Sequence, residues 1–147
     1  MEFASCLVPV SGEKVDDDVI RLACSLSQKG KVKGRVYIVY VIEMKRLLPL
    51  DAENEPDMER GEKVLAHAED TARAMDFEVE TEMLQAREVG PAIVDEAVER
   101  GVDVIVMGTN YRRRFGEFDM GSTVPYVFKN APCRVLLWRE SVDRGET

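Results

Sequence analysis

Hydrophobic positions recur along the chain with two periods, one typical of strands and the other typical of helices. Residues 3–10 and 35–43 are rich in β-branched and aromatic residues, which predicts two strands. The segment between them carries one apolar stripe at spacings of four, three and four: Val15, Val19, Leu22 and Leu26. This stripe predicts an amphipathic helix that ends near Gly30.

The same alternation continues to the end of the chain. Residues 44–57 contain two prolines and many acids, and they predict a loop. Helices are predicted at 58–75, 90–100 and 122–130, and strands at 77–85, 102–107 and 132–138. Strands that alternate with helices in this way predict an α/β fold, in which a parallel sheet carries helices on both faces.

Open parallel sheets bind ligands beyond the carboxyl ends of their strands, where the strand order reverses. If the first strand is central, this crevice lies between the ends of the first and fourth strands. Ser11 and its neighbours would then face Gly108 and the loop that follows it.

Length and charge narrow the class of protein. A chain of 147 residues predicts a single domain spanning 1–147, and 45% hydrophobic with 33% charged residues is typical of a soluble globular protein. No apolar run approaches the roughly 18 residues that span a bilayer, and the N-terminus reads as a strand instead of a signal peptide. The net charge of −8 disfavours nucleic acid and anionic membranes as partners.

Three cysteines show no metal-like or redox-motif spacing. They are Cys6, Cys24 and Cys133. Small buried thiols in a reducing cytoplasm are the expected reading, and the protein is therefore expected to be cytoplasmic.

Two clusters of polar residues are weighed as sites and set aside. Asp16, Asp17 and Asp18 fall in the first turn of a predicted helix, where carboxylates favour the positive end of the dipole. Consecutive helical residues point to different sides, so a metal site there is not expected. His67 is the single histidine, and the sequence places no acid or nucleophile beside it, which favours a solvated or partly packed side chain.

The segment GTNYRRRFGEFDMGST at 108–123 follows the most apolar predicted strand. Gly121-Ser122-Thr123 precedes a helix, whose first N–H groups could cradle a phosphate. The same pattern is also an ordinary helix cap. Neither GxxxxGK[ST] nor GxGxxG occurs, which argues against P-loop and dinucleotide-binding proteins.

Three segments resemble the universal stress protein family: LVPVSG at 7–12, VGPAIVDEAVERGVDVIVMGTN at 89–110 and GSTVPYVFKNAPCRVLLW at 121–138. The resemblance implies a Rossmann-like, adenine nucleotide alpha hydrolase-like fold, with a five-stranded parallel sheet in the strand order 3-2-1-4-5 and helices on both faces. Many members bind ATP through G-x2-G-x9-G-[ST], with an acid at the end of the first strand. Gly108, Gly121 and Ser122 match this motif, whereas Tyr111 stands at its middle glycine and Ser11 at the acid.

These departures bear on how a nucleotide would be held. Tyr111 adds bulk where the backbone of relatives approaches the phosphates, and Ser11 keeps a hydrogen-bonding group without the charge that helps to hold a divalent metal. Pro125 removes one N–H from the helix's first turn. Arg112 to Arg114 could clamp phosphate oxygens in place of a metal, or could simply be solvated or paired with nearby acids.

The resemblance therefore implies a stress-response regulatory domain that binds an adenine nucleotide, either ATP or AMP, through an altered loop. The adenine is placed near Val10 and Val41, the ribose near Ser11 and Gly108, and the phosphates over Gly121 to Thr123. The complete predicted site is Pro9, Val10, Ser11, Val41, Met107, Gly108, Tyr111, Arg112, Gly121, Ser122, Thr123 and Val124.

No catalytic residue and no metal ligand are predicted, because no general base or metal-binding acid remains near the proposed phosphates; weak ATPase activity is the most that is expected. The alternative function is a nucleotide-free dimeric interaction module in which the loop is degenerate.

The last predicted strand supplies a further expectation. Arg134 to Trp138 would form an apolar sheet edge in a monomer, and such an edge needs covering. In the family this strand pairs across a two-fold axis, so the resemblance implies a homodimer. Trp138 is placed near that contact, with a plain core position as the other reading.

Overall fold

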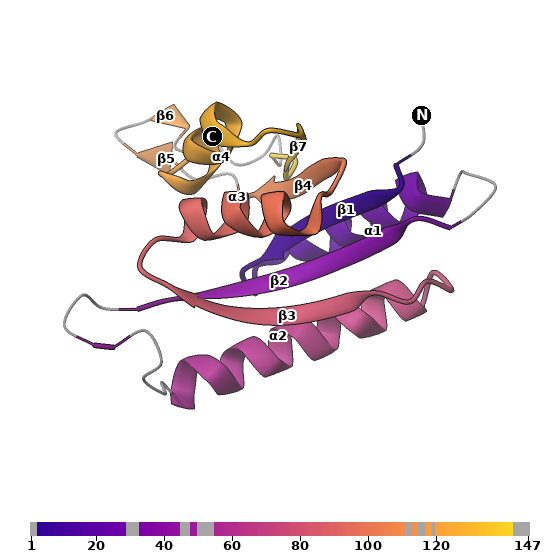
Figure 1. The fold of residues 1–147 in the computed structure, drawn as a ribbon, viewed down its shortest axis with the longest axis horizontal. Helices are drawn as coiled ribbons and strands as arrows, with labels where there is room; N and C mark the ends of the chain where they lie inside the picture. The colour runs from indigo at the N-terminus through magenta and orange to yellow at the C-terminus, as the bar shows by residue number, and fades with distance from the viewer. Residues whose placement is uncertain are drawn as a thin grey trace.

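A computed structural model describes residues 3–28, 33–44, 48–49, 55–110 and 120–142, together with the backbone of 113–114 and 117–118. One parallel sheet organises this part of the chain (Figure 1). Its strands, in spatial order, are β3 (Glu80–Ala86), β2 (Arg35–Glu43), β1 (Ser5–Val10), β4 (Val104–Thr109) and β7 (Arg134–Arg139). Counted along the chain, this is the predicted order 3-2-1-4-5, and all four neighbouring pairs run parallel.

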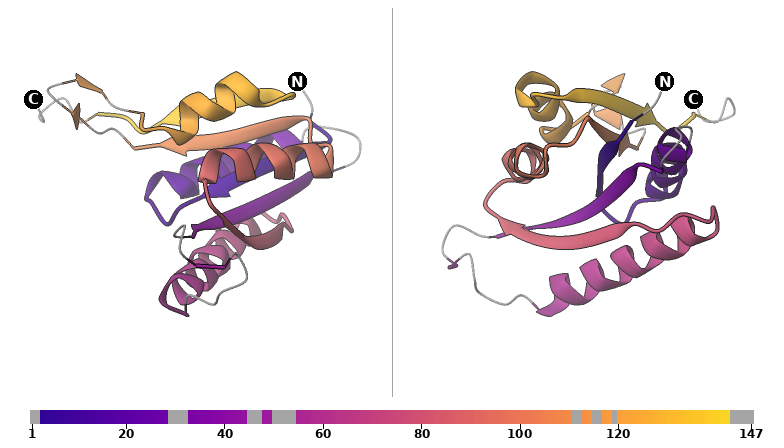
Figure 2. Two further views of the ribbon diagram at one scale, coloured as in Figure 1. Left: turned by 60° about the vertical axis from the view of Figure 1, so that its left-hand side comes forward. Right: turned by 45° about the vertical axis from the view of Figure 1, so that its right-hand side comes forward.

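Helices cover both faces of the sheet, as the α/β alternation predicts (Figure 2). One face carries α1 (Val15–Gln28) and α2 (Glu55–Arg73), and the other carries α3 (Val89–Arg100) and α4 (Thr123–Asn130). Alternate residues of β1 show the division, because Cys6 and Val8 pack in the core below α1 whereas Leu7 packs in the core below α3. Central strands buried on both faces explain the unbroken apolar runs in the sequence.

Two element boundaries differ from prediction for identifiable reasons. Helix α2 begins at Glu55 instead of 58, because Pro56 falls in its first turn, where no backbone N–H is needed. Strand β3 begins at Glu80 instead of 77. Phe77 is buried, and its N–H closes the end of α2 by bonding to the carbonyl oxygen of Ala72 at 3.1 Å, so it belongs to the helix end and not to the strand.

A short antiparallel pair was not predicted at all. Strands β5 (Arg113–Arg114) and β6 (Glu117–Phe118) pair within the segment that joins β4 to α4. The pair is too short to carry the alternating pattern that marks longer strands.

The cysteines are largely where the sequence predicts them to be. Cys6 and Cys24 are buried free thiols, as predicted, whereas Cys133 is only partly buried. Burial raises the pKa of Cys24 to about 11, which leaves it protonated and unreactive. None of the described helices is both long and apolar enough to cross a membrane.

Candidate functional site

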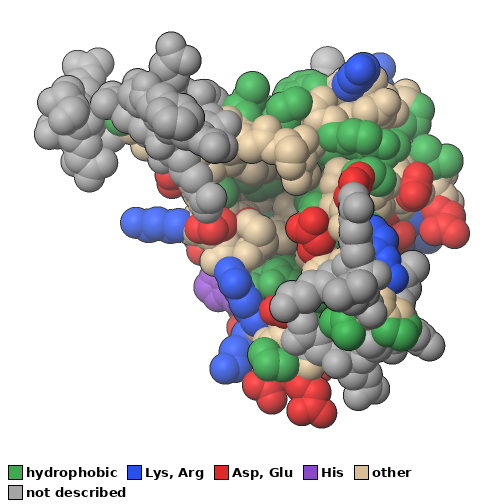
Figure 3. Space-filling model, turned by 90° about the vertical axis from the view of Figure 1, so that its left-hand side faces the viewer, with side chains coloured by type: hydrophobic (Ala, Val, Ile, Leu, Met, Phe, Trp, Pro, Cys, Tyr) green, Lys and Arg blue, Asp and Glu red, His purple; other side chains and the backbone are tan. Residues whose placement is uncertain are grey.

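A cavity of about 370 Å³ lies at the carboxyl ends of β1 and β4. These two strands are neighbours, but β1 continues the sheet toward β2 and β4 continues it toward β7, so the strand order reverses between them. This is the crevice that the sequence predicted. Figure 3 looks onto this end of the sheet, where acidic side chains lie across the middle of the face.

Most of the predicted site residues line this cavity. They are Pro9, Val10, Ser11, Met107, Gly108, Gly121, Thr123 and Val124. Val41 is outside the lining and packs against the core below α3 and α4. Ser122 lines a neighbouring cavity of about 270 Å³, which shares Thr123 with the first. Tyr111 and Arg112 lie outside the described residues.

Gly108 is fixed by packing against α1. A Cβ atom at this position would lie 2.6 Å from Cγ2 of Val19 and 3.0 Å from Cγ2 of Val15. Such distances are too short for carbon atoms, so glycine is required here whether or not a phosphate binds. The glycine that begins the sequence motif is thus explained by the core alone.

Gly121 has a different role. Its φ of +71° is a left-handed conformation that glycine adopts freely, and a Cβ atom there would meet no heavy atom within 4 Å. The residue bends the chain into α4 through its left-handed backbone conformation. Ser122 follows at the N-cap, and its side chain makes no capping hydrogen bond, so its hydroxyl is not committed to the helix.

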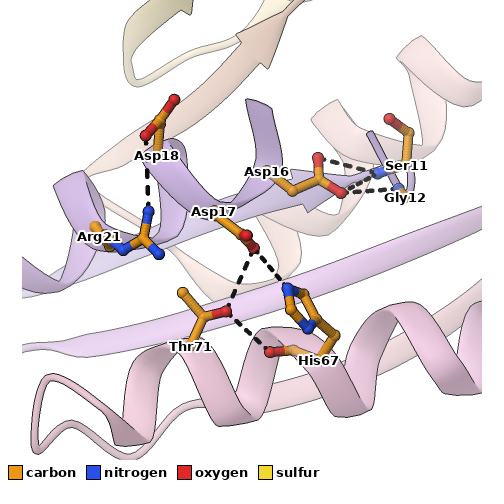
Figure 4. Close-up of polar contacts among 8 residues, drawn as sticks. All are labelled: Ser11, Gly12, Asp16, Asp17, Asp18, Arg21, His67 and Thr71. Atoms are coloured by element: carbon orange, nitrogen blue, oxygen red, sulfur yellow. Dashed lines mark hydrogen bonds and ion pairs between the residues drawn. The ribbon is translucent and has the colours of Figure 1, made fainter. Parts of the chain in front are cut away.

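Asp16 also lines the cavity, although the sequence suggested only a favourable interaction with the dipole of its helix. Its buried carboxylate accepts hydrogen bonds from the N–H of Gly12 at 2.8 Å and of Ser11 at 3.3 Å (Figure 4). Burial raises the pKa of Asp16 to about 6, while the N–H groups of Gly12, Ser11 and Glu13 oppose the rise. An acid in the first turn after a glycine loop is the sequence signal for this contact, since it can reach back to loop donors.

The other two acids of the run point elsewhere, as predicted. Asp18 pairs with Arg21 on its own helix at 3.7 Å, and Asp17 accepts a hydrogen bond from Thr71 of α2 at 3.3 Å. Asp17 also lies 2.9 Å from Nε2 of His67. The prediction that no acid partners His67 is therefore wrong, because the partner comes from α1, far away in sequence. No group of three or more potential ligands among the described residues is placed to hold a metal.

The charge of the cavity is unusual for an anion site. Its described lining includes the carboxylates of Glu13 and Asp16 and contains no lysine or arginine. The neighbouring cavity adds Glu43 and Glu88. Any anion bound here would depend on backbone N–H groups, on the positive end of α4, or on a cation reaching in from another element.

The strand order and the position of this cavity define a doubly wound α/β protein with a crevice at its switch point. The model of the universal stress protein family matches residues 2–139, so the chain belongs to the universal stress protein family. This confirms the resemblance carried by the three sequence segments.

Individual relatives agree with this assignment. A universal stress protein of Methanocaldococcus jannaschii is 26% identical over 141 residues, which cover 92% of this chain and 81% of the relative. The structure of a universal stress protein from Archaeoglobus fulgidus matches with a TM-score of 0.76 at 23% identity, over 90% of this chain and 96% of the other. A universal stress protein from Archaeoglobus fulgidus in complex with dAMP matches with a TM-score of 0.70 at 23% identity, over 93% and 98% of the two chains.

Proposed function

We propose that this protein binds an adenine nucleotide in the cavity between β1 and β4 and acts as a dimeric regulatory domain in a stress response. The cavity itself is the observation that carries the proposal. Its volume of about 370 Å³ falls in the range of small-molecule sites, and it lies where open α/β sheets bind ligands. The complex of an Archaeoglobus fulgidus relative with dAMP supports the choice of an adenine nucleotide.

The proposed pose follows the lining of the cavity. The adenine lies against Val10, the ribose lies beside Ser11 and Gly108, and the phosphate lies over Gly121 to Thr123. The free hydroxyl of Ser122 and the N–H groups at the start of α4 are available there. Val41 lies outside the lining and is left with an indirect role in supporting the base.

Release of bound nucleotide tests the proposal directly. The protein is purified under native conditions and denatured, and the supernatant is analysed for adenine nucleotides. In parallel, thermal unfolding is followed with millimolar AMP, ATP or cyclic AMP. A ligand at about 100 times its dissociation constant stabilises the fold by about 2.7 kcal/mol, which raises the melting temperature by several degrees. Absence of both nucleotide and thermal shift would overturn the proposal.

A nucleotide-free interaction module is the second candidate. It is favoured by Gly108, which α1 packing already requires, and by the acidic lining of the cavity. Under this function the release and thermal-shift experiments give no signal, while the oligomeric state persists.

The dimer is proposed to form through β7. Among the strands that the structure describes, β7 pairs in the sheet with β4 alone, and its side chains Leu136 and Trp138 are 37% and 40% exposed. The reading of Trp138 as a plain core residue is therefore wrong. An apolar edge strand invites pairing with another copy, and we expect β7 to meet β7 of a partner across a two-fold axis.

Sedimentation velocity tests this interface. Trp138→Lys is expected to shift the protein toward monomer, because it places a charge in the contact. Phe128→Lys is the control, since Phe128 is exposed to a similar extent on α4. A dimer that survives Trp138→Lys and dissociates with Phe128→Lys would move the interface to α4.

A further inference from the structure

The proposed ligand is an anion, yet the charged side chains in the described lining of the cavity are both negative, those of Glu13 and Asp16. A cation reaches the rim of the cavity from α2. Nη2 of Arg60 lies 3.4 Å from the carbonyl oxygen of Ser11, a residue of the cavity lining. Arg60 lies outside the family motif, so the sequence pattern did not single it out.

The loop between β1 and α1 lies directly against α2 at this point. Gly12 has a φ of +85°, and a Cβ atom there would lie 3.0 Å from Cγ2 of Val64 and 3.5 Å from Nη2 of Arg60. The glycine therefore leaves room for the guanidinium beside the loop. A residue with a side chain at this position would strain the backbone and crowd Val64, while its Cβ atom would lie in ordinary contact with Arg60.

The guanidinium keeps most of its bonding capacity. A distance of 3.4 Å is at the long end for a hydrogen bond, and the remaining N–H groups of the fork are on an exposed side chain. The side chain is long and flexible enough to shift from the Ser11 carbonyl to a ligand atom beside it. A guanidinium binds a phosphate with two parallel hydrogen bonds, which a neutral ribose hydroxyl cannot match.

We propose that Arg60 is a specificity-determining residue that selects adenine nucleotides carrying a phosphate monoester on the 3′ oxygen of the ribose. This inference rests on the proposed function, in which the ribose lies beside Ser11 and a 5′ phosphate points away toward Gly121 to Thr123. The hydroxyl edge of the ribose then faces Arg60. The carboxylate of Asp16, in the first turn of α1, is bonded to the N–H groups of this loop and would repel a 3′ phosphate, so the guanidinium is needed to offset it.

Calorimetric titration of wild type and Arg60→Gln with 3′-AMP, 5′-AMP and adenosine tests this assignment. We expect wild type to bind 3′-AMP more tightly than adenosine. Arg60→Gln should lower the affinity for 3′-AMP by about tenfold and change the other two by less than about twofold, since only the charged hydrogen bonds are lost. Arg73→Gln on the same helix, whose guanidinium pairs with Asp70 at 2.7 Å, is the matched control and should change none of the three.

Each other outcome is informative. An equal loss for all three ligands would overturn the assignment and leave Arg60 a purely structural support of the loop. Unchanged affinity for 3′-AMP would also overturn it. If wild type binds none of the three ligands, the proposed function itself fails, which is a different result from an intact site that does not respond to Arg60→Gln.

Discussion

At the β1 edge of the cavity, the N–H groups of Ser11 and Gly12 are already bonded to Asp16, whereas at the α4 edge the hydroxyl of Ser122 makes no capping bond. At the β1 edge, the backbone donors are thus bonded to a side chain of the same edge, and Gly12 packs against α2. The α4 edge bends through Gly121, whose φ is +71° and where an added Cβ atom would meet no heavy atom within 4 Å. A preorganised wall and an uncommitted helix start together suit a site that positions one part of a ligand and captures the other.

The two motif glycines show the same contrast. Gly108 supports the core, because α1 leaves no room for a Cβ atom, whereas Gly121 supports only a backbone conformation. Matching a family motif therefore does not give its residues a common function. Four predictions test this contrast, beginning with the largest expected effect.

Gly108→Ala is expected to destabilise the fold by about 3 kcal/mol, because the new methyl group would overlap Val19. Denaturant unfolding measures the loss. The double variant Gly108→Ala with Val19→Ala should recover part of it, since the second change removes the clashing methyl groups. A single variant as stable as wild type would show that α1 can move, and the glycine would then need another explanation.

Asp16→Asn is expected to change how stability depends on pH. Burial raises the pKa of Asp16 to about 6 in the folded protein, above its value in the unfolded chain, so folding favours the protonated form. The corresponding stability is fully present below about pH 4 and is lost as pH rises through about 6, an effect of about 3 kcal/mol. Wild type should lose this stability between about pH 4 and 7, and Asp16→Asn should not.

Unfolding in denaturant at a series of pH values measures this difference. Asp18→Asn is the control, because Asp18 is on the exposed side of the same helix and pairs with Arg21. Its pH profile should match that of wild type. Parallel profiles for wild type and Asp16→Asn would contradict the assignment of a shifted carboxyl at the β1 edge.

Gly121→Ala is expected to cost about 1 kcal/mol through backbone strain and to weaken nucleotide binding, since the loop before α4 must shift. Gly101→Ala provides a matched control. Gly101 also has a positive φ, of 61°, with no heavy atom near its missing Cβ, but it caps α3 at the opposite end of the sheet. We expect both variants to lose a similar amount of stability and only Gly121→Ala to lose affinity for the nucleotide, which would assign the α4 edge to the ligand. An equal loss of affinity in both variants would argue against this assignment.

Tyr111→Gly is expected to have the smallest effect on stability and to raise the affinity for ATP, because it restores the glycine of the family motif. Replacing Arg112 to Arg114 with alanine should lower that affinity if the arginines contact phosphate. Calorimetric titration with ATP measures both. Strong ATP binding that is the same in wild type and Tyr111→Gly would show that the tyrosine is no obstacle.

The sequence predicted the order of the elements, the sheet and the crevice well, because apolar periodicity directly reflects which faces are buried. It was less accurate at element ends. Pro56 resembled a loop signal although it fits the first turn of α2, and Phe77 resembled a strand residue although it closes the same helix. In both cases the residue type is compatible with two local structures, and packing with the rest of the fold decides between them.

The contacts between polar side chains from distant segments were the hardest feature to predict from the sequence. Asp17 contacts His67, which is 50 residues away in the sequence, and Arg60 contacts Ser11, which is 49 residues away. No periodicity links such residues, because the members of each pair belong to different elements. Asp17 is on α1, His67 and Arg60 are on α2, and Ser11 is in the loop after β1. The neighbouring acids of the run diverge because consecutive helical side chains point in different directions, which the sequence did predict.

What the sequence by itself determined is the succession of strands and helices, which follows from buried periodicity, and the family, which follows from its motifs. The strand order and the place of the crevice were expected from the resemblance to that family. Only the tertiary structure decided which contacts the individual residues make at that crevice. Gly108 leaves no room for a Cβ atom beside Val19, Asp16 bonds the N–H of Gly12, and Arg60 reaches the carbonyl oxygen of Ser11 from α2. Each depends on distances between elements remote in sequence, which exist only once the sheet has brought those elements together.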